Sequence, residues 1–311
     1  MKIPVIIDAD PGVDDSYAMA MANAYKGFDI RAITAVEGNV SAEKTRYNSL
    51  CLAETLNIPC RVGFGAELPL RKKYDRQATV VHGKNGIGEI QLPKPNVEPD
   101  AKAAWDIIYE EAVQSEGELI LVAIGPLTNV ALALRKYPDL PKYLKHVYIM
   151  GGGLFGNVTP KAEFNVWVDP TAAKEVFEKL QVHMVGLNAT HQIALTDADF
   201  DELVEICSMS EKNWFLRELL LYSKKNSIVQ NSDSQIIHDA LVIAAIIDDT
   251  IIQYEKCEVY VEDRDGVLNE GETVVNRSCK SSKEGNCWVA MDVNRSRFVE
   301  LLKDTCKYYN N

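Results

Sequence analysis

The stretch of sequence that decides the fold is KIPVIIDADPGVDD, residues 2–15. Its first part, Lys2–Ile7, is a short run rich in Val and Ile, as is typical of a buried parallel strand. Two aspartates, a Pro-Gly turn and two more aspartates follow directly, at positions 8, 10, 14 and 15. The stretch therefore predicts a buried strand that delivers a cluster of carboxylates to one edge of a sheet.

Similar apolar runs predict further buried strands at Ile30–Val36, Leu119–Ile124, Val147–Met150 and Val182–Leu187. Amphipathic segments alternate with them and predict helices at Asp15–Tyr25, Ala42–Leu56, Ala101–Gln114, Asn129–Tyr137, Thr171–Leu180 and His238–Ile247. This alternation favours an α/β fold, an open and mostly parallel sheet with helices on both faces. Because no repeat or low-complexity linker interrupts it, we expect a single domain over residues 1–311. The active site of such a sheet is expected at the carboxyl ends of the strands.

Three segments break the alternation and are predicted to be loops near that site. Residues 64–100 are rich in Gly, Pro and charge, residues 151–169 are rich in Gly, and residues 223–237 are polar. A connection as long as the first is uncommon unless it serves a function.

Composition excludes several classes of protein. Hydrophobic residues at 47% and charged residues at 25% are ordinary for a globular chain. The excess of 45 acidic over 33 basic residues, a net charge of -12, disfavours nucleic acid and anionic membrane as partners. The N-terminus is too short and too acidic for a signal peptide, and the seven cysteines show no CxxC spacing. We therefore expect a cytoplasmic protein with reduced thiols.

The aspartate cluster points to a metal ion. Carboxylates packed together without a counter-charge repel one another and raise each other's pKa. A hard cation relieves that repulsion, and oxygen ligands of this kind suit Ca²⁺ or Mg²⁺. The alternative is a solvated acidic loop in which Asp14 or Asp15 caps the next helix.

Other polar residues are weaker candidates when taken singly. Glu163 and Asn165 flank Phe164 and offer the acceptors and donors that a vicinal diol needs. Asn39 follows the second predicted strand, and His238-Asp239 opens an apolar helix after a polar segment. A helix-capping Asp239 and a structural histidine are the alternatives there. His82 is a further candidate of the same kind.

Two enzyme motifs compete with this interpretation. Asp8 and Asp10 after an apolar strand resemble the nucleophile and acid of haloacid-dehalogenase-type Mg²⁺ phosphatases, and Ile247-Asp248-Asp249 could supply the second acidic pair. That motif usually continues with a residue other than the Pro11 found here. The second acidic pair also has no clear lysine partner. The GxGxxG match at residues 151–156 runs into loop sequence instead of a helix, which disfavours a dinucleotide site.

Taken together, the motifs resemble the inosine-uridine preferring nucleoside hydrolase family over nearly the whole chain. The most specific match is the aspartate motif of residues 8–15. The others follow in the family's order: Glu37-Gly38-Asn39, His82-Gly83, Gly125-Pro126-Leu127-Thr128-Asn129, Met150-Gly151-Gly152-Gly153, Glu163-Phe164-Asn165 and His238-Asp239.

The resemblance implies a ribonucleoside hydrolase that uses one Ca²⁺ per subunit to cleave the bond between ribose and base. By position, the side chains of Asp10, Asp15 and Asp239 and the carbonyl of Ile124 resemble the metal ligands. Asp10 also resembles the general base, and His238 the acid that protonates the leaving base. The substrate-binding set comprises Asp14, Asn39, His82, Met150, Asn157, Glu163, Phe164 and Asn165. Family members are usually homodimers or homotetramers, and nucleoside salvage is the role that this chemistry suggests.

These residue types suit the reaction. Glycoside hydrolysis passes through an oxocarbenium-like state, which nearby carboxylates stabilise. Ca²⁺ acidifies water less than Zn²⁺ does, so a carboxylate base remains useful, and a histidine can protonate a poor leaving group.

Base preference stays open between purine, pyrimidine and both. Residues 74–90 and Ser223–Ile237 should form the base pocket, and the second segment lacks the tyrosines of several pyrimidine-preferring members. Ala240-Leu241 also replaces a common proline after Asp239. A nucleoside-binding protein without turnover is a further alternative, although the intact Asp10 disfavours it.

Overall fold

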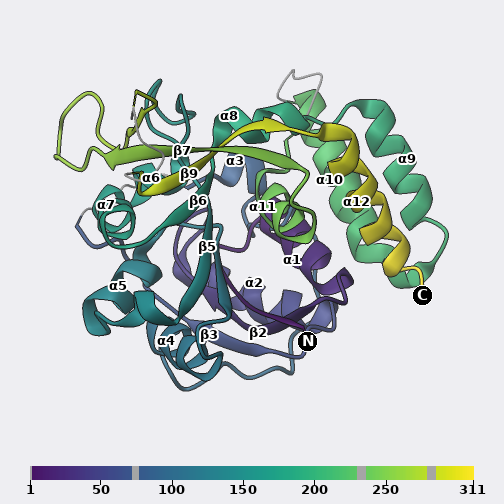
Figure 1. The fold of residues 1–311 in the computed structure, drawn as a ribbon. Helices are drawn as coiled ribbons and strands as arrows, with labels where there is room; N and C mark the ends of the chain where they lie inside the picture. Colours follow the sequence, from purple (N-terminus) through teal and green to yellow (C-terminus); the bar gives the residue numbers. More distant parts are fainter. Residues whose placement is uncertain (1, 72–76, 230–235, 279–284) are drawn as a thin grey trace.

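Strand β1 (Ile3–Ala9) lies between β2 (Phe28–Ala35) and β4 (Leu119–Ala123), and pairs with both in parallel. The computed structural model describes residues 2–71, 77–229, 236–278 and 285–311. These residues form a nine-stranded sheet in the order β3-β2-β1-β4-β5-β6-β9-β7-β8 (Figure 1). The remaining strands are β3 (Arg61–Phe64), β5 (Leu144–Met150), β6 (Val182–Val185), β7 (Ile252–Val261), β8 (Thr273–Asn276) and β9 (Cys287–Val293). Among the strands described, the antiparallel pairs are β7 with β8 and β7 with β9. The predicted mostly parallel α/β sheet is confirmed.

Helices cover both faces of the sheet, as predicted (Figure 1). One face, carrying Val5 and Ile7, is covered by α1 (Val13–Ala24), α2 (Ala42–Thr55), α9 (Asp197–Cys207), α10 (Trp214–Val229), α11 (His238–Ile247) and α12 (Arg295–Tyr308). The other face, carrying Ile6, is covered by α4 (Ala104–Gln114), α5 (Thr128–Lys136) and α7 (Pro170–Lys179). Short helices at the loops are α3 (Thr79–His82), α6 (Phe164–Val168) and α8 (Leu187–Thr190), with 3-10 turns η1 (Leu140–Tyr143), η2 (His191–Ile193) and η3 (Glu211–Asn213).

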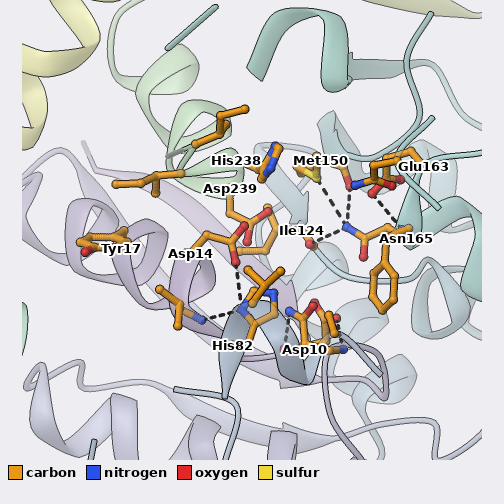
Figure 2. A pocket seen from close by; sticks show the side chains of 18 of the residues that line it. Asp10, Asp14, Tyr17, His82, Ile124, Met150, Glu163, Asn165, His238 and Asp239 are labelled. Carbon is orange, nitrogen blue, oxygen red and sulfur yellow. Dashed lines mark hydrogen bonds and ion pairs between the residues drawn. The ribbon is translucent and has the colours of Figure 1, made fainter. Parts of the chain in front are cut away.

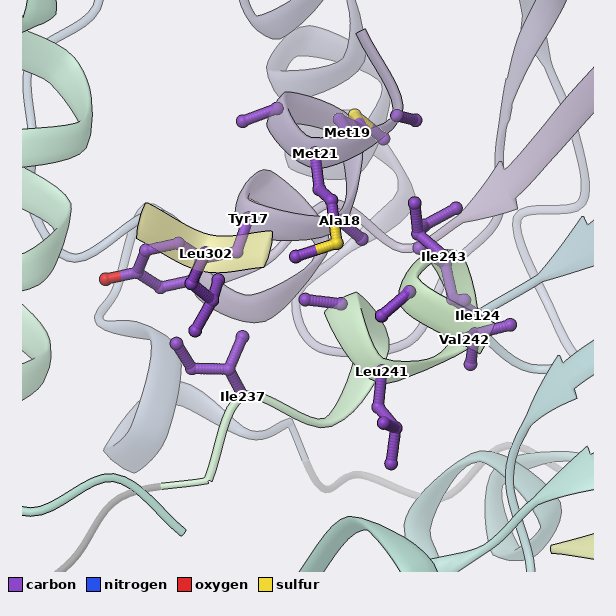
Figure 3. Close-up of a cluster of buried hydrophobic side chains, with 14 of the residues drawn as sticks. Tyr17, Ala18, Met19, Met21, Ile124, Ile237, Leu241, Val242, Ile243 and Leu302 are labelled. Carbon is purple, nitrogen blue, oxygen red and sulfur yellow. The ribbon is translucent and has the colours of Figure 1, made fainter. Parts of the chain in front are cut away.

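Helix α11 is the inner helix of the first face. All of its residues from Asp239 to Ala245 are buried, and they pack against α1 and α12 (Figure 3). Met21 of α1, Leu241 of α11 and Leu302 of α12 belong to the same apolar cluster. Because apolar contacts surround α11, its N-terminal Asp239 is held close to Asp14 and Asp15 in the first turn of α1.

The predicted loop at residues 223–237 is wrong in its first part. Helix α10 continues to Val229, and residues 230–235 lie outside the described residues. Ser and Asn are only moderate helix formers. Tertiary contacts stabilise them here, because Ser223 bonds to Tyr17 and Asn226 bonds to the Val81 carbonyl.

The sheet brings several chain segments to one edge. The Val36 amide donates to the Ala9 carbonyl, and the Ile124 amide donates to the Asp8 carbonyl. The parallel register therefore carries the residues after β1, β2 and β4 to the same place, and the residues after β5 continue the row.

No helix among the described residues is long and apolar enough to cross a membrane. Cys51, Cys60, Cys207, Cys257, Cys287 and Cys306 carry free thiols, and Cys279 lies outside the described residues.

Candidate active site

A cavity of about 550 Å³ opens at the carboxyl edge of the sheet (Figure 2). Its size is ordinary for a small-molecule site. The predicted site residues that line it are Asp10, Asp14, Asn39, His82, Ile124, Met150, Asn157, Glu163, Phe164, Asn165, His238 and Asp239. Asp15 lies beside it, at the N-terminus of α1. The structure thus brings together in one place the residues that the sequence analysis assigned to a nucleoside hydrolase site.

The turn between β1 and α1 fixes the first carboxylates. The Asn39 amide donates to Asp10 Oδ2 at 2.7 Å, and the Gly12 amide donates to Asp15 Oδ2 at 2.8 Å. The Asn39 side chain also donates to Asp15 Oδ2, at 3.2 Å. A side chain at position 12 would not fit, because its Cβ would lie 2.6 Å from His82 Nδ1. Glycine is therefore required at position 12 for the β1–α1 turn to pack this closely against His82.

Three carboxylates converge next to this turn. Oxygen atoms of Asp14, Asp15 and Asp239 lie within 4.8 Å of one another. Burial and the neighbouring Asp14 raise the pKa of Asp15 to about 8. Burial and the charge of Asp15 raise the pKa of Asp10 well above its ordinary value, and burial and Asp14 do the same for Asp239. This cluster is therefore strained unless a positive charge compensates it.

The residues fit a hard cation. Asp10 Oδ1 and Asp15 Oδ1 are buried and have no hydrogen-bond partner among the described residues. No Lys or Arg of the described ranges lines the cavity. The Ile124 carbonyl lies in the wall and accepts one bond, from Asn165 Nδ2 at 3.0 Å. Carboxylate and carbonyl oxygens are what Ca²⁺ prefers, so Asp10, Asp15, Asp239 and Ile124 remain the predicted ligands. Asp14, predicted for substrate, joins Asp15 and Asp239 in the close group.

The far wall presents a carboxylate and an amide, as predicted. Glu163 caps α6, where its carboxylate accepts from the Asn165, Val166 and Gly152 amides. Burial raises the pKa of Glu163 to about 7. The Asn165 side chain donates to the carbonyls of Ile124 and Met150, which leaves its Oδ1 for a ligand. By contrast, the side-chain nitrogen of Asn39 donates to the Asp10 carbonyl and to Asp15 Oδ2. The main role of Asn39 is therefore to hold these aspartates in place.

Two imidazoles line the cavity. The Val13 amide donates to His82 Nδ1 at 3.0 Å, so that nitrogen carries no proton and neutral His82 bears its proton on Nε2. His238 begins α11, and its Nδ1 lies 2.8 Å from Thr190 Oγ1. The helix starts at His238 although Ala240 replaces the common proline. Burial lowers the pKa of His238 to about 4 and also lowers that of His82.

The remaining wall is mostly apolar. It comes from the two segments expected to hold the base, with Gln77, Ala78, Val80, Val81, Ser223, Ile236 and Ile237. Val13, Tyr17 and Val158 also line the cavity and were not anticipated. For Tyr17 a signal existed, because it stands one helical turn after Asp14 on α1. Residues 74–76 and 230–235 of the expected pocket lie outside the described residues.

The geometry argues against a dehalogenase-type phosphatase. Asp8, its required nucleophile, is fully buried beneath the site, where it accepts bonds from Thr34 and Asn129. Asp248 follows the opposite end of α11 from His238 and pairs with Arg297 at 2.7 Å. Neither carboxylate lines the cavity.

In sequence, the chain is similar to known nucleoside hydrolases. Residues 5–300 match the inosine-uridine preferring nucleoside hydrolase family. The chain is 35% identical over 300 residues to the non-specific ribonucleoside hydrolase RihC of Klebsiella pneumoniae, covering 96% of each chain. It is also 35% identical over 320 residues to the pyrimidine-specific ribonucleoside hydrolase RihA of Escherichia coli, covering 99% of this chain and 100% of that one.

Solved structures lead to the same family. The purine-preferring ribonucleoside hydrolase from Gardnerella vaginalis superposes with a TM-score of 0.91 at 26% identity, over 99% of both chains. The plant nucleoside hydrolase PpNRh1 superposes with a TM-score of 0.89 at 30% identity, again over 99% of both chains. The chain therefore belongs to the inosine-uridine preferring nucleoside hydrolase family. The prediction of an enzyme of the nucleoside hydrolase class is confirmed with it.

Proposed function

We propose that this protein hydrolyses the N-glycosidic bond of ribonucleosides, with Ca²⁺ as cofactor, and releases ribose and a free base. One observation carries the proposal. Carboxylates with buried oxygens that have no hydrogen-bond partner among the described residues line a cavity of about 550 Å³, and His82 and His238 line the same cavity. Cleavage of a nucleoside requires carboxylates next to the sugar and N–H donors next to the base.

Asp10 is the proposed general base. Its Oδ2 is held by the Asn39 amide, while its Oδ1 is buried and has no partner among the described residues. One oxygen thus orients the carboxylate and the other is left to take a proton from water. A bound Ca²⁺ would keep these carboxylates ionised and would bind both the water and the ribose hydroxyls.

The ribose is proposed to lie between Asp14 and the Glu163–Asn165 wall. The Oδ1 of Asn165, which accepts no hydrogen bond from a described residue, can accept one from a ribose hydroxyl. The carboxylates on both sides stabilise the positive charge that develops on the sugar. Met150, Asn157 and Phe164 complete the proposed contacts. Asn39 supports the site by holding Asp15.

The base is proposed to leave toward His238 and His82. A nucleobase anion is a poor leaving group, so an N–H from His238 lowers the barrier. The surrounding wall is mostly aliphatic, with Val80, Val81 and Ile237. Because an apolar wall discriminates weakly between flat heterocycles, we propose that both purine and pyrimidine ribonucleosides are accepted.

The test is to incubate the protein with inosine, uridine and a phosphate monoester, and to assay ribose, free base and phosphate. We expect ribose and base in equal amounts, no phosphate, loss of activity with a chelator, and recovery with Ca²⁺. Phosphate release with Mg²⁺ alone would support the phosphatase. Nucleoside binding without ribose release would support a binding protein. The homodimer or homotetramer, the salvage role and the cytoplasmic location stay predictions.

A further inference from the structure

Thr190 is a fully buried residue next to the site to which the sequence assigned no role. It ends α8, the short helix that follows β6 at the carboxyl edge of the sheet. It does not line the cavity. Its hydroxyl oxygen lies 2.8 Å from Nδ1 of His238, which is 48 positions further along the chain.

The surroundings of this hydroxyl indicate the direction of its hydrogen bond. Among the described residues, the only other acceptor in contact with this hydroxyl is the Leu187 carbonyl, at 3.4 Å. That carbonyl already accepts the His191 amide. The contact with His238 is much shorter, and an O–H donor at 2.8 Å has ordinary hydrogen-bond length. The Thr190 hydroxyl therefore donates its hydrogen bond to His238 Nδ1.

A neutral imidazole carries its proton on one nitrogen only. If Nδ1 accepts from Thr190, the proton stays on Nε2. No described residue bonds to His238 Nε2, and the ring lines the cavity. His82 shows the same arrangement, because the Val13 amide forces its Nδ1 to accept.

We propose that Thr190 is a positioning residue that holds His238 in the tautomer with its N–H on Nε2, aimed at the departing base. The role rests on the proposed function, since it gives His238 its donor. The hydroxyl acts through the histidine and does not touch the substrate. Thr190 also fixes the ring against rotation, because turning the ring would break the bond at Nδ1.

The kinetic test compares Thr190→Val with Thr190→Ser. Valine keeps the shape and removes the hydroxyl, so kcat for inosine and uridine should fall about 10–100-fold with little change in KM. Hydrolysis of p-nitrophenyl riboside, whose leaving group needs no proton, should change less than about threefold. Serine keeps the hydroxyl and should restore most of the lost activity. Thr305→Val is the matched control, because that buried hydroxyl bonds to the Leu301 carbonyl in α12.

A double variant separates positioning from a general structural effect. In the His238→Ala background, Thr190→Val should cost nothing more on inosine. A further loss there would overturn the proposal. So would an equal loss on inosine and p-nitrophenyl riboside that follows the drop in melting temperature.

A spectroscopic readout is independent of turnover. The imidazole nitrogen shifts of His238, assigned with His238→Ala, should show a protonated Nε2 in the native protein and a mixture of tautomers in Thr190→Val. A protonated Nδ1 in the native protein would overturn the proposal. Absence of nucleoside hydrolysis by the native enzyme would instead defeat the proposed function, and the nitrogen spectrum would still decide the tautomer.

Discussion

At the scale of single residues, Asp10 links the aspartate motif to the chemistry. Asp10→Asn should lower ribose release by about 10²–10⁴-fold, because an amide cannot take a proton from water. The melting temperature should change little, since an amide oxygen can still accept from the Asn39 amide. Asp29→Asn, on a carboxylate paired with Arg31 outside the cavity, is the control for lost charge. Near-normal turnover in Asp10→Asn would remove Asp10 from the mechanism.

His238 should matter in proportion to how poorly the base leaves. His238→Ala is expected to slow hydrolysis of inosine and uridine by about 10²–10⁴-fold, the usual effect of a general acid. It should barely affect p-nitrophenyl riboside, because nitrophenolate leaves without a proton. Steady-state rates on both substrates provide the measurement, with His146→Ala, an exposed histidine on β5, as control. An equal loss on both substrates would assign His238 a structural role and turn attention to His82.

At the scale of elements, α3 depends on α10 for its position. The hydroxyl of Tyr222 and the amide of Asn226 both donate to the Val81 carbonyl, each at 3.1 Å. Val81 and its neighbours Val80 and His82 line the cavity. The pair of bonds thus connects the long predicted loop to a helix that begins in the apolar core.

Removing both donors should weaken substrate binding. The double variant Tyr222→Phe, Asn226→Ala is expected to raise KM for nucleosides about 3–30-fold, because each lost bond costs about 1 kcal/mol. kcat should fall much less, since Asp10 and His238 are untouched. Initial-rate kinetics over a range of inosine concentrations would show this. A fall in kcat at constant KM would mean that α3 serves the chemical step instead.

At the scale of the whole molecule, one partly buried histidine away from the site couples stability to pH. The ring of His183 on β6 stacks on Tyr148 with centroids 4.4 Å apart, and its Nδ1 is buried without a partner among the described residues. Burial and the nearby His146 lower the pKa of His183 from 6.5 to about 4. Between those two pH values the unfolded chain binds the proton more readily than the folded one. The stability that depends on neutral His183 is therefore complete above pH 6.5 and is lost as the pH falls toward 4.

His183→Phe should reduce this sensitivity to acid. Phenylalanine does not titrate, so the free energy of unfolding should fall less between pH 7 and 4.5, by about 1–3 kcal/mol relative to the native protein. Urea unfolding at the two pH values measures the difference. An identical acid loss in both proteins would show that His183 is not the group responsible.

Local pattern determined the part of the site that lies next to strands. Residues 2–15 combine an apolar strand with carboxylates, and the parallel register carries them to the same edge as Ile124. The carboxyl edge was therefore predictable from alternation alone. Strands β7, β8 and β9 were missed because they mix buried and exposed positions, and short β3 was missed because it has no long Val or Ile run.

Only the tertiary structure decided which distant residues meet. Asp239 joins Asp14 and Asp15 because α11 packs against α1, and nothing in the sequence around Asp239 encodes that contact. Resemblance to a family placed His238 and Asp239 in the site, but it could not reveal that Thr190 bonds to His238 or that α10 continues to Val229. Such contacts depend on how helices pack, and packing depends on the shape of the whole core, whereas strand and helix patterns depend only on neighbours along the chain.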